Sequence, residues 1–314
     1  MEQVVDKWAA RWKSRFGAST IRGMTESTTQ NGYLFKTIGV IGVGLLGGSI
    51  AAAARQRNLA ETILGAGRNP SRMRAAQQAG LLDRGTTNIA ETAAQSDLVI
   101  VCTPVNQIVQ FIQTVAQNSR PGTIITDVGS TKQKICKQLK GTLPAGVTFV
   151  ASHPLAGSEK SGFEFSDQNL FQNRPCVITP EESVPAETVS RVRRFWEALG
   201  MHVLQTTPEQ HDLILAETSH LPHVVASALA ATLAAENTRY TSTGFRDTTR
   251  IAGGDPALWI DILLSNRDAI VTSLDKYAQT LQQFRDAIQN NDEKRLRELL
   301  EDGKKKHDTL NSAS

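Results

Sequence analysis

The sequence has few cysteines, few aromatic residues and no long apolar run. Its three cysteines, Cys102, Cys136 and Cys176, are widely spaced and form no C-x-x-C pair, so we expect reduced thiols in the core of a cytoplasmic protein and assign no metal site. No apolar run approaches the length of a membrane span, and we expect no membrane partner. A formal net charge of +3 over 314 residues is too small to indicate nucleic acid as a partner.

Residues 1–33 form an extension with a composition of its own. Trp8, Trp12 and Phe16 recur every four residues among lysines and arginines, which favours a short amphipathic helix. The segment lacks the apolar region of a secretory signal. A packed or frayed extension and contact with a membrane surface are both open interpretations. Met24 is a second candidate for the first residue.

Short apolar strands alternate with helical stretches over residues 34–207. The strands, such as "KTIGVIG" and "DLVIVCTP", are rich in valine and isoleucine. Such alternation indicates an α/β fold, with a mostly parallel sheet covered on both faces. We therefore expect a doubly wound, Rossmann-type dinucleotide-binding domain here.

Residues 208–314 contain no strand-like run. Their helical stretches are long, and one begins at Asp255-Pro256, an N-cap residue followed by proline. The apolar stripe on these helices is wider than one small bundle needs to cover. We therefore expect an all-helical substrate and dimerisation domain, and a homodimer.

A glycine-rich loop follows the first strand. It has the pattern Gly42-x-Gly44-x-x-Gly47 and opens an alanine-rich helix, which is the context that a dinucleotide-binding loop requires. The first glycine permits a tight turn, the second lets a pyrophosphate approach, and the third lets helix and strand pack closely. We predict that the whole loop binds the cofactor: Gly42, Val43, Gly44, Leu45, Leu46 and Gly47.

The second strand ends in Gly67-Arg68, where an NAD enzyme usually has an acidic residue for the ribose. With no carboxylate to repel a 2′-phosphate, Arg68 could bind one through paired N–H donors. We therefore favour NADP over NAD, although an enzyme that accepts both remains a competing interpretation. Thr103 and Pro104 end another strand and are expected to line the cofactor crevice.

Polar residues also end the later strands, in "TDVGSTK" at 126–132 and "HPLAGSEKSG" at 153–162. With "SHLPH" at 219–223 and "GFRDTTRIAGGDPALW" at 244–259, these motifs and the glycine loop occur in the order found in the prephenate/arogenate (cyclohexadienyl) dehydrogenase family. The chain resembles that family from Lys36 to about Arg297. The resemblance implies oxidative decarboxylation of a cyclohexadienyl substrate, in tyrosine biosynthesis, with hydride transfer to NAD(P)+.

The resemblance also implies roles for individual residues. His153 matches the catalytic histidine, and a neutral imidazole suits a base that removes a hydroxyl proton at cellular pH. Ser130 matches a serine that contacts both the hydroxyl region and the nicotinamide. Further matches bind the substrate or gate its pocket: Arg250, His223, Glu159, Asp212 and Trp259, the last expected from the partner subunit. His202, His211 and His220 are assigned no role in catalysis. A helix turns only one of His220 and His223 fully into a pocket, so His220 is interpreted as a packing or capping residue.

The substrate is left open. We favour prephenate, which would yield 4-hydroxyphenylpyruvate, over arogenate, which would yield tyrosine directly; dual specificity is a third possibility. A β-hydroxyacid dehydrogenase would share the architecture but uses a helix-borne lysine, and the stretch 209–236 contains none. A non-catalytic, NADP-sensing protein would keep the glycine loop but would have no use for His153, Ser130 and Arg250.

Overall fold

The computed structural model describes residues 32–157 and 160–312. It contains a six-stranded sheet in the order β3-β2-β1-β4-β5-β6, with every neighbouring pair parallel. The strands are β1 (Phe35–Ile41), β2 (Ala60–Ala66), β3 (Arg84–Thr86), β4 (Leu98–Val101), β5 (Ile124–Asp127) and β6 (Thr148–Phe149). The doubly wound parallel sheet expected from the sequence is confirmed, and the short strand β3 is an addition to it.

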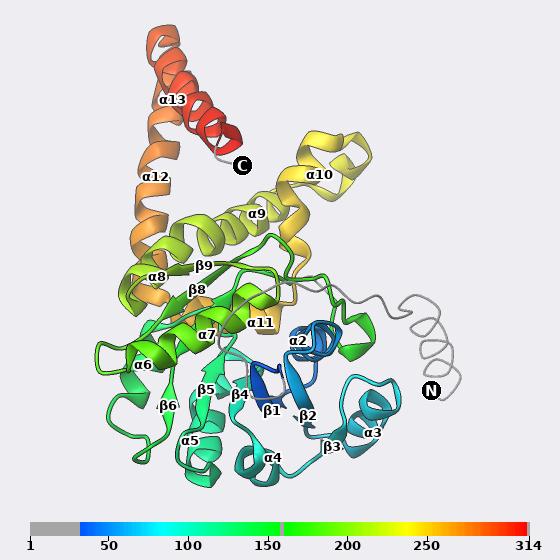
Figure 1. Ribbon diagram of the computed structural model, residues 1–314. Helices are drawn as coiled ribbons and strands as arrows, with labels where there is room; N and C mark the ends of the chain where they lie inside the picture. The colour runs from blue at the N-terminus through cyan, green and yellow to red at the C-terminus, as the bar shows by residue number, and fades with distance from the viewer. Residues whose placement is uncertain (1–31, 158–159, 313–314) are drawn as a thin grey trace.

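Helices cover both faces of this sheet (Figure 1). They are α2 (Leu45–Gln56), α3 (Pro70–Gln78), α4 (Ile89–Gln95), α5 (Ile108–Asn118), α6 (Gln133–Leu139) and α7 (Ala186–Ala198). Successive residues of a strand point to opposite faces, so in β4 Ile100 joins the core cluster that contains α2 and α7, and Val101 joins the cluster that contains α5. Burial on both faces is the reason that these strands read as unbroken apolar runs.

The run 147–154, which reads as one strand, divides into two. Its second half is β7 (Ala151–Pro154), which pairs antiparallel with β8 (Pro175–Thr179), and β8 pairs parallel with β9 (His202–Gln205) in a separate three-stranded sheet. Side chains at the end of β5 hold β7: the backbone N–H of Ser152 donates to Asp127 Oδ1 at 3.1 Å. This turn of the chain directs His153 away from the main sheet.

Only helices follow β9 within residues 206–312. They are α8 (Pro208–Leu215), the π-helical turn η3 (Ala216–His220), α9 (Leu221–Ala231), η4 (Ala235–Tyr240), α10 (Thr243–Thr249), η5 (Arg250–Gly253), α11 (Pro256–Ser265), α12 (Arg267–Gln289) and α13 (Glu293–Ser312). Helices α12 and α13, orange to red in Figure 1, extend together from the body that holds the sheets. In the described part of the chain, none of the helices has both the length and the apolar character needed to cross a membrane.

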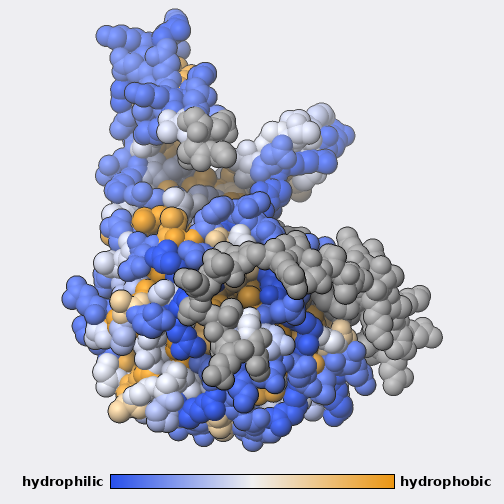
Figure 2. Space-filling view, viewed as in Figure 1, coloured by the Kyte–Doolittle hydropathy of each residue, from blue (hydrophilic) through white to orange (hydrophobic). Residues whose placement is uncertain are grey.

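These projecting helices keep apolar side chains at their surface. Val271, Leu281, Ile288 and Leu300 are each at least half exposed, and Figure 2 shows apolar surface where α12 leaves the body. A chain by itself would not normally leave so many large apolar side chains in water.

Candidate active site

The glycine loop adopts the conformation that its spacing predicts. Gly42 has a φ of +93°, and a side chain there would meet the carbonyl oxygen of Cys102 at 2.7 Å. A Cβ on Gly47 would lie 2.2 Å from the carbonyl oxygen of Gly42, so helix α2 packs directly on the loop. A Cβ on Gly44, in contrast, would meet nothing within 4 Å. The loop is therefore closed on its protein side and open on the side where a pyrophosphate would lie.

A cavity of about 300 Å³ adjoins this loop. Among its lining residues are Gly42, Val43, Gly44, Arg68, Asn69, Arg72, Thr103 and Pro104. Leu45, Leu46 and Gly47 belong to the first turn of α2, whose N-terminus has no side-chain cap. The hydroxyl of Thr103 is buried with no hydrogen-bond partner among the described residues. An unsatisfied hydroxyl and uncapped N–H groups fit the polar groups of a dinucleotide.

The end of this cavity at β2 contains arginines and no lining carboxylate. Arg68 is exposed there. Arg72, which the sequence analysis did not assign, also lines the cavity, and its Nη2 contacts Glu164 Oε2 at 2.8 Å. Sequence reasoning missed this pair because Glu164 lies 92 positions away. The charge at this end suits an anionic group.

Three side chains form a hydrogen-bonded row at the end of β7. Nδ1 of His153 lies 2.9 Å from Nε2 of His211, and Nδ1 of His211 lies 2.7 Å from Oδ1 of Asp212. The exposed fractions of the three residues are 8%, 0% and 2%. Sequence analysis assigned His211 no role in catalysis, and it gave no sign that α8 would bring this imidazole to His153.

Asp212 lies at the inner end of the row. Its Oδ1 accepts the backbone N–H of Lys132 at 2.7 Å, and its Oδ2 accepts that of Gln133 at 3.0 Å. Its backbone carbonyl accepts a hydrogen bond from Asn266 Nδ2 at 2.7 Å. The two backbone N–H groups hold the carboxylate at the start of α6, where it faces His211 and is almost fully buried.

A buried ion pair lies beside the row. Nζ of Lys132 contacts the carboxylate of Asp127 and also donates to the carbonyl of Ser152, next to His153, at 2.9 Å. Lys132, which the sequence left without a role, thus joins β5, β7 and the start of α6. Ser130 lies between Asp127 and Lys132, in the turn that connects β5 to α6, and is partly exposed.

The two histidines of "SHLPH" are both buried. Nδ1 of His220 lies 3.1 Å from Nδ2 of Asn266, and the ring of His223 stacks on Trp259 with centroids 3.5 Å apart. Sequence analysis expected only one of the two to turn fully into a pocket; both are buried, and η3 changes the helical phase ahead of His223. Trp259 stacks on His223 of its own chain, and its entry into the site from the partner subunit stays a prediction.

His223 keeps one polar atom free. Its Nδ1 is buried and has no hydrogen-bond partner among the described residues. Arg250 lies on η5, which packs against α9. Its side chain is exposed and forms no ion pair with the described residues. Glu159, like the extension 1–31, lies outside the described residues.

Burial favours the neutral forms of His153, His220 and His223. Desolvation lowers the pKa of His153 well below its ordinary value, and His211, Lys132 and His220 lower it further. Burial lowers the pKa of His220 to about 4, and burial also lowers that of His223. A neutral imidazole at His153 is the form that can accept a proton.

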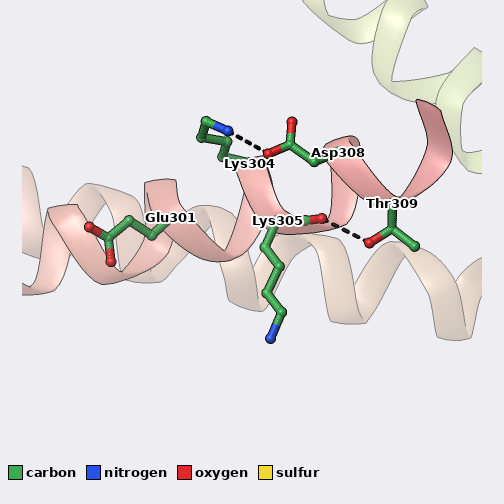
Figure 3. Close-up of a pocket in the computed structure, with 5 residues that line it drawn as sticks. All are labelled: Glu301, Lys304, Lys305, Asp308 and Thr309. Atoms are coloured by element: carbon green, nitrogen blue, oxygen red, sulfur yellow. Dashed lines mark hydrogen bonds and ion pairs between the residues drawn. The ribbon is translucent and has the colours of Figure 1, made fainter. Parts of the chain in front are cut away.

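A second hollow lies on α13, far along the chain from these residues. Figure 3 shows Glu301, Lys304, Lys305, Asp308 and Thr309 around it. Lys304 pairs with Asp308 one helical turn away, and Thr309 Oγ1 donates to the backbone carbonyl of Lys305 at 3.0 Å. The exposed side chains of one helix form this hollow, and both of the bonds just described join residues of that helix.

Comparison with known proteins shows the family of the chain. Residues 50–205 match the family model of the prephenate dehydrogenase nucleotide-binding domain, and residues 207–302 match that of the prephenate dehydrogenase dimerization domain. The chain belongs to the prephenate dehydrogenase family. It is accordingly an NAD(P)-dependent dehydrogenase with a Rossmann fold, as the sequence motifs predicted.

Individual relatives match along most of their length. A prephenate dehydrogenase of Bacillus subtilis is 33% identical over 281 residues, which cover 87% of this chain and 76% of the relative. A cyclohexadienyl dehydrogenase of Zymomonas mobilis is 34% identical over 279 residues, covering 87% and 95%.

Solved structures show the same agreement. The prephenate dehydrogenase of A. aeolicus in complex with hydroxyphenyl propionate and NAD+ matches with a TM-score of 0.82 and 33% identity, covering 88% of this chain and 98% of that one. Synechocystis arogenate dehydrogenase matches with a TM-score of 0.75 and 30% identity, covering 87% and 99%.

Proposed function

We propose that the protein catalyses the oxidative decarboxylation of prephenate to 4-hydroxyphenylpyruvate, with hydride transfer to NAD(P)+, in tyrosine biosynthesis. The observation that carries the proposal is a nearly buried imidazole, His153, on β7, whose lowered pKa favours the neutral form and whose strand is hydrogen-bonded to the end of β5. The names of the relatives support a substrate of the prephenate or arogenate type. Arogenate, or both substrates, is the second candidate because an arogenate dehydrogenase and a cyclohexadienyl dehydrogenase also match along most of the chain.

The chain's own residues suit this reaction. The glycine loop and the N-terminus of α2 would bind the pyrophosphate of the cofactor. The bound nicotinamide would supply the hydride acceptor. His153 would take the proton of the ring hydroxyl as hydride leaves the carbon that bears this hydroxyl. The C–C bond to the ring carboxylate would then break, its electron pair would make the ring aromatic as carbon dioxide leaves, and His153 would return the proton to the resulting phenolate oxygen. Ser130 would contact the hydroxyl region from the turn after β5.

The substrate's acid groups need cationic or donor partners. Arg250 would bind a carboxylate through its planar guanidinium. His223 would offer its unpartnered Nδ1, held in place by the stacked ring of Trp259. Glu159 and Asp212 are proposed to affect access to the site. Asp212 would do so from α8, through the hydrogen bonds that it accepts at the start of α6. These assignments depend on the family resemblance together with the positions described above.

We propose NADP as the preferred cofactor. Arg68 lines the cavity at the end of β2 beside Arg72, which is paired with Glu164, and none of the described lining residues is acidic; this favours a 2′-phosphate over a bare ribose hydroxyl. The A. aeolicus relative was solved with NAD+, so NAD remains the alternative.

We also propose a division into a nucleotide-binding unit, 34–207, and a helical unit, 208–314, that dimerises. The exposed apolar side chains of α12 and α13 support a homodimer, as does the family name of the second matched region. The mass in solution, measured by light scattering, tests this assignment.

Initial rates of reduced-nicotinamide formation test the function directly. Prephenate and arogenate are each assayed with NAD and with NADP, and we expect the highest kcat/KM for prephenate with NADP. A higher kcat/KM with arogenate would move the assignment to the second candidate. No turnover with either substrate, in a protein that binds the cofactor, would overturn both.

A further inference from the structure

We propose that His211 is a positioning residue that keeps His153 in the tautomer with its proton on Nδ1 and its Nε2 free to act as the base. Asp212 in turn fixes the orientation of His211. This inference rests on the proposed role of His153, and it adds two residues that act through His153 rather than on the substrate.

The direction of the row is set at Asp212. Its carboxylate already accepts two backbone N–H groups at the start of α6, from Lys132 and Gln133. Both of its oxygens therefore act as acceptors, and an ionised carboxylate can only accept hydrogen bonds. Nδ1 of His211 must therefore carry a proton and donate it to Asp212.

The tautomer of His153 follows from that of His211. A neutral His211 with a proton on Nδ1 has a lone pair on Nε2, and that atom lies 2.9 Å from Nδ1 of His153. Nδ1 of His153 must then be the donor, which leaves Nε2 without a proton. Nε2 forms no hydrogen bond with the described residues, so it is the atom available to a substrate hydroxyl.

Protonation of His211 would reverse this arrangement. An imidazolium donates from both nitrogens, so Nδ1 of His153 would have to accept and its proton would move to Nε2, where it would block the base. Because the two imidazoles share one hydrogen bond, a proton added to either changes what the other can donate or accept. The other charged or titratable groups that face His153 are Lys132 at the start of α6, His220 on η3 and Cys176 on β8.

The row also has a role after proton transfer. When Nε2 of His153 takes the hydroxyl proton, Nδ1 keeps its own proton and continues to donate it to Nε2 of His211. The positive charge on His153 then lies two hydrogen bonds from the Asp212 carboxylate, in a site with little water. No other proton has to move.

Two substitutions at His211 separate positioning from packing. His211→Leu removes the acceptor for Nδ1 of His153, and we expect kcat to fall by roughly 10²–10³-fold with the KM for prephenate changed little, since only the tautomer is released. His211→Gln offers an amide oxygen to His153 and an amide N–H to Asp212, and we expect it to retain more than about a tenth of the wild-type kcat. Equal losses in both variants would overturn the proposal.

The pH profile gives a readout that packing alone would not change. Glutamine does not titrate, so the acid limb of the kcat profile of His211→Gln should move to lower pH, because one of the two sites that take up the inactivating proton is gone. An acid limb identical to that of the wild type would contradict the proposal.

A double-variant cycle ties the effect to His153. In a His153→Asn background, His211→Leu should cost no further activity, because the base that His211 positions is absent. Additive losses would overturn the positioning role.

The single variants distinguish this inference from the proposed function. Loss of activity in His153→Asn with full activity in His211→Leu would refute this inference and leave the proposed function intact. Full activity in His153→Asn would refute the proposed base itself. NADP affinity and thermal melting check the fold, and His202→Gln, an exposed histidine on β9, is the matched control.

Discussion

Lys132 and Asp127 form an ion pair in which neither side chain has any solvent exposure. The carboxylate also accepts the backbone N–H groups of Gly129 and Ser152, and the ammonium donates to the Ser152 carbonyl. The pair therefore joins β5 to β7 directly beside His153. Because burial of two charges is unfavourable, each depends on the other to remain inside.

Lys132→Met tests this dependence. Removing the ammonium leaves the Asp127 carboxylate buried without its partner, and we expect the free energy of unfolding to fall by about 3–5 kcal/mol. Chemical denaturation measures the change. The double variant Lys132→Met, Asp127→Asn should be destabilised less than the single variant, because no unpaired charge remains. A loss below about 1 kcal/mol in the single variant would show that water reaches the pair.

His153→Asn tests the proposed base. Asparagine can hydrogen-bond but cannot take up a proton at neutral pH, so kcat should fall by roughly 10²–10⁴-fold. The affinity for NADP, measured by fluorescence titration, should stay near the wild-type value because the glycine loop is untouched. Unchanged turnover would remove His153 from the mechanism.

Arg250→Ala tests the substrate anchor. Loss of the guanidinium should raise the KM for prephenate, with a cost in binding of about 2–5 kcal/mol, because the carboxylate would lose its charged partner in the closed site. Arg246→Ala, an exposed arginine on the neighbouring helix α10, is the control and should keep the KM of the wild type. If both variants keep that KM, the carboxylate binds elsewhere.

Arg68→Ala tests the cofactor preference. Removal of one cation from the end of the cavity at β2 should lower kcat/KM for NADP by roughly 10-fold or more, as expected for a lost charge-assisted hydrogen bond, with little effect on NAD. Arg74→Ala changes an arginine on the following helix, α3, that is not among the residues lining the cavity, and it should leave the ratio of kcat/KM for NADP to that for NAD unchanged. Equal use of NAD and NADP by the wild-type enzyme would already contradict the preference.

His220 makes stability depend on pH. Its folded pKa, about 4, lies below the ordinary value of 6.5, so the unfolded state binds the proton first as the pH falls. The stabilisation is complete above about pH 6.5 and is lost between about pH 6.5 and pH 4, by about 3 kcal/mol for this residue. His153 contributes in the same direction.

The variant His220→Gln isolates this contribution. Its unfolding free energy, followed by denaturant titration from pH 7 to pH 4, should decline by about 3 kcal/mol less than that of the wild type. Glutamine can still accept a hydrogen bond from Asn266, as His220 does. Parallel curves for the two proteins would show that folding does not lower the pKa of His220.

Local sequence determined the dinucleotide loop. Gly42 and Gly47 lie within one strand, one turn and one helix, so their spacing alone dictates the turn and the close approach that the structure contains. The alternation of buried strands and amphipathic helices likewise predicted the parallel sheet, because each element must cover a continuous apolar face. The motifs near His153 and His223 gave the family.

Tertiary structure alone decided how the site is assembled. His153 and His211 are 58 positions apart, and they meet because β7 leaves the main sheet and α8 packs against α6. Neither residue's neighbours in sequence encode that contact, so a histidine that supports the base looks the same in the sequence as one that only packs. The same holds for Lys132, which became a buried partner of Asp127 only through the fold, because burial depends on what other segments cover.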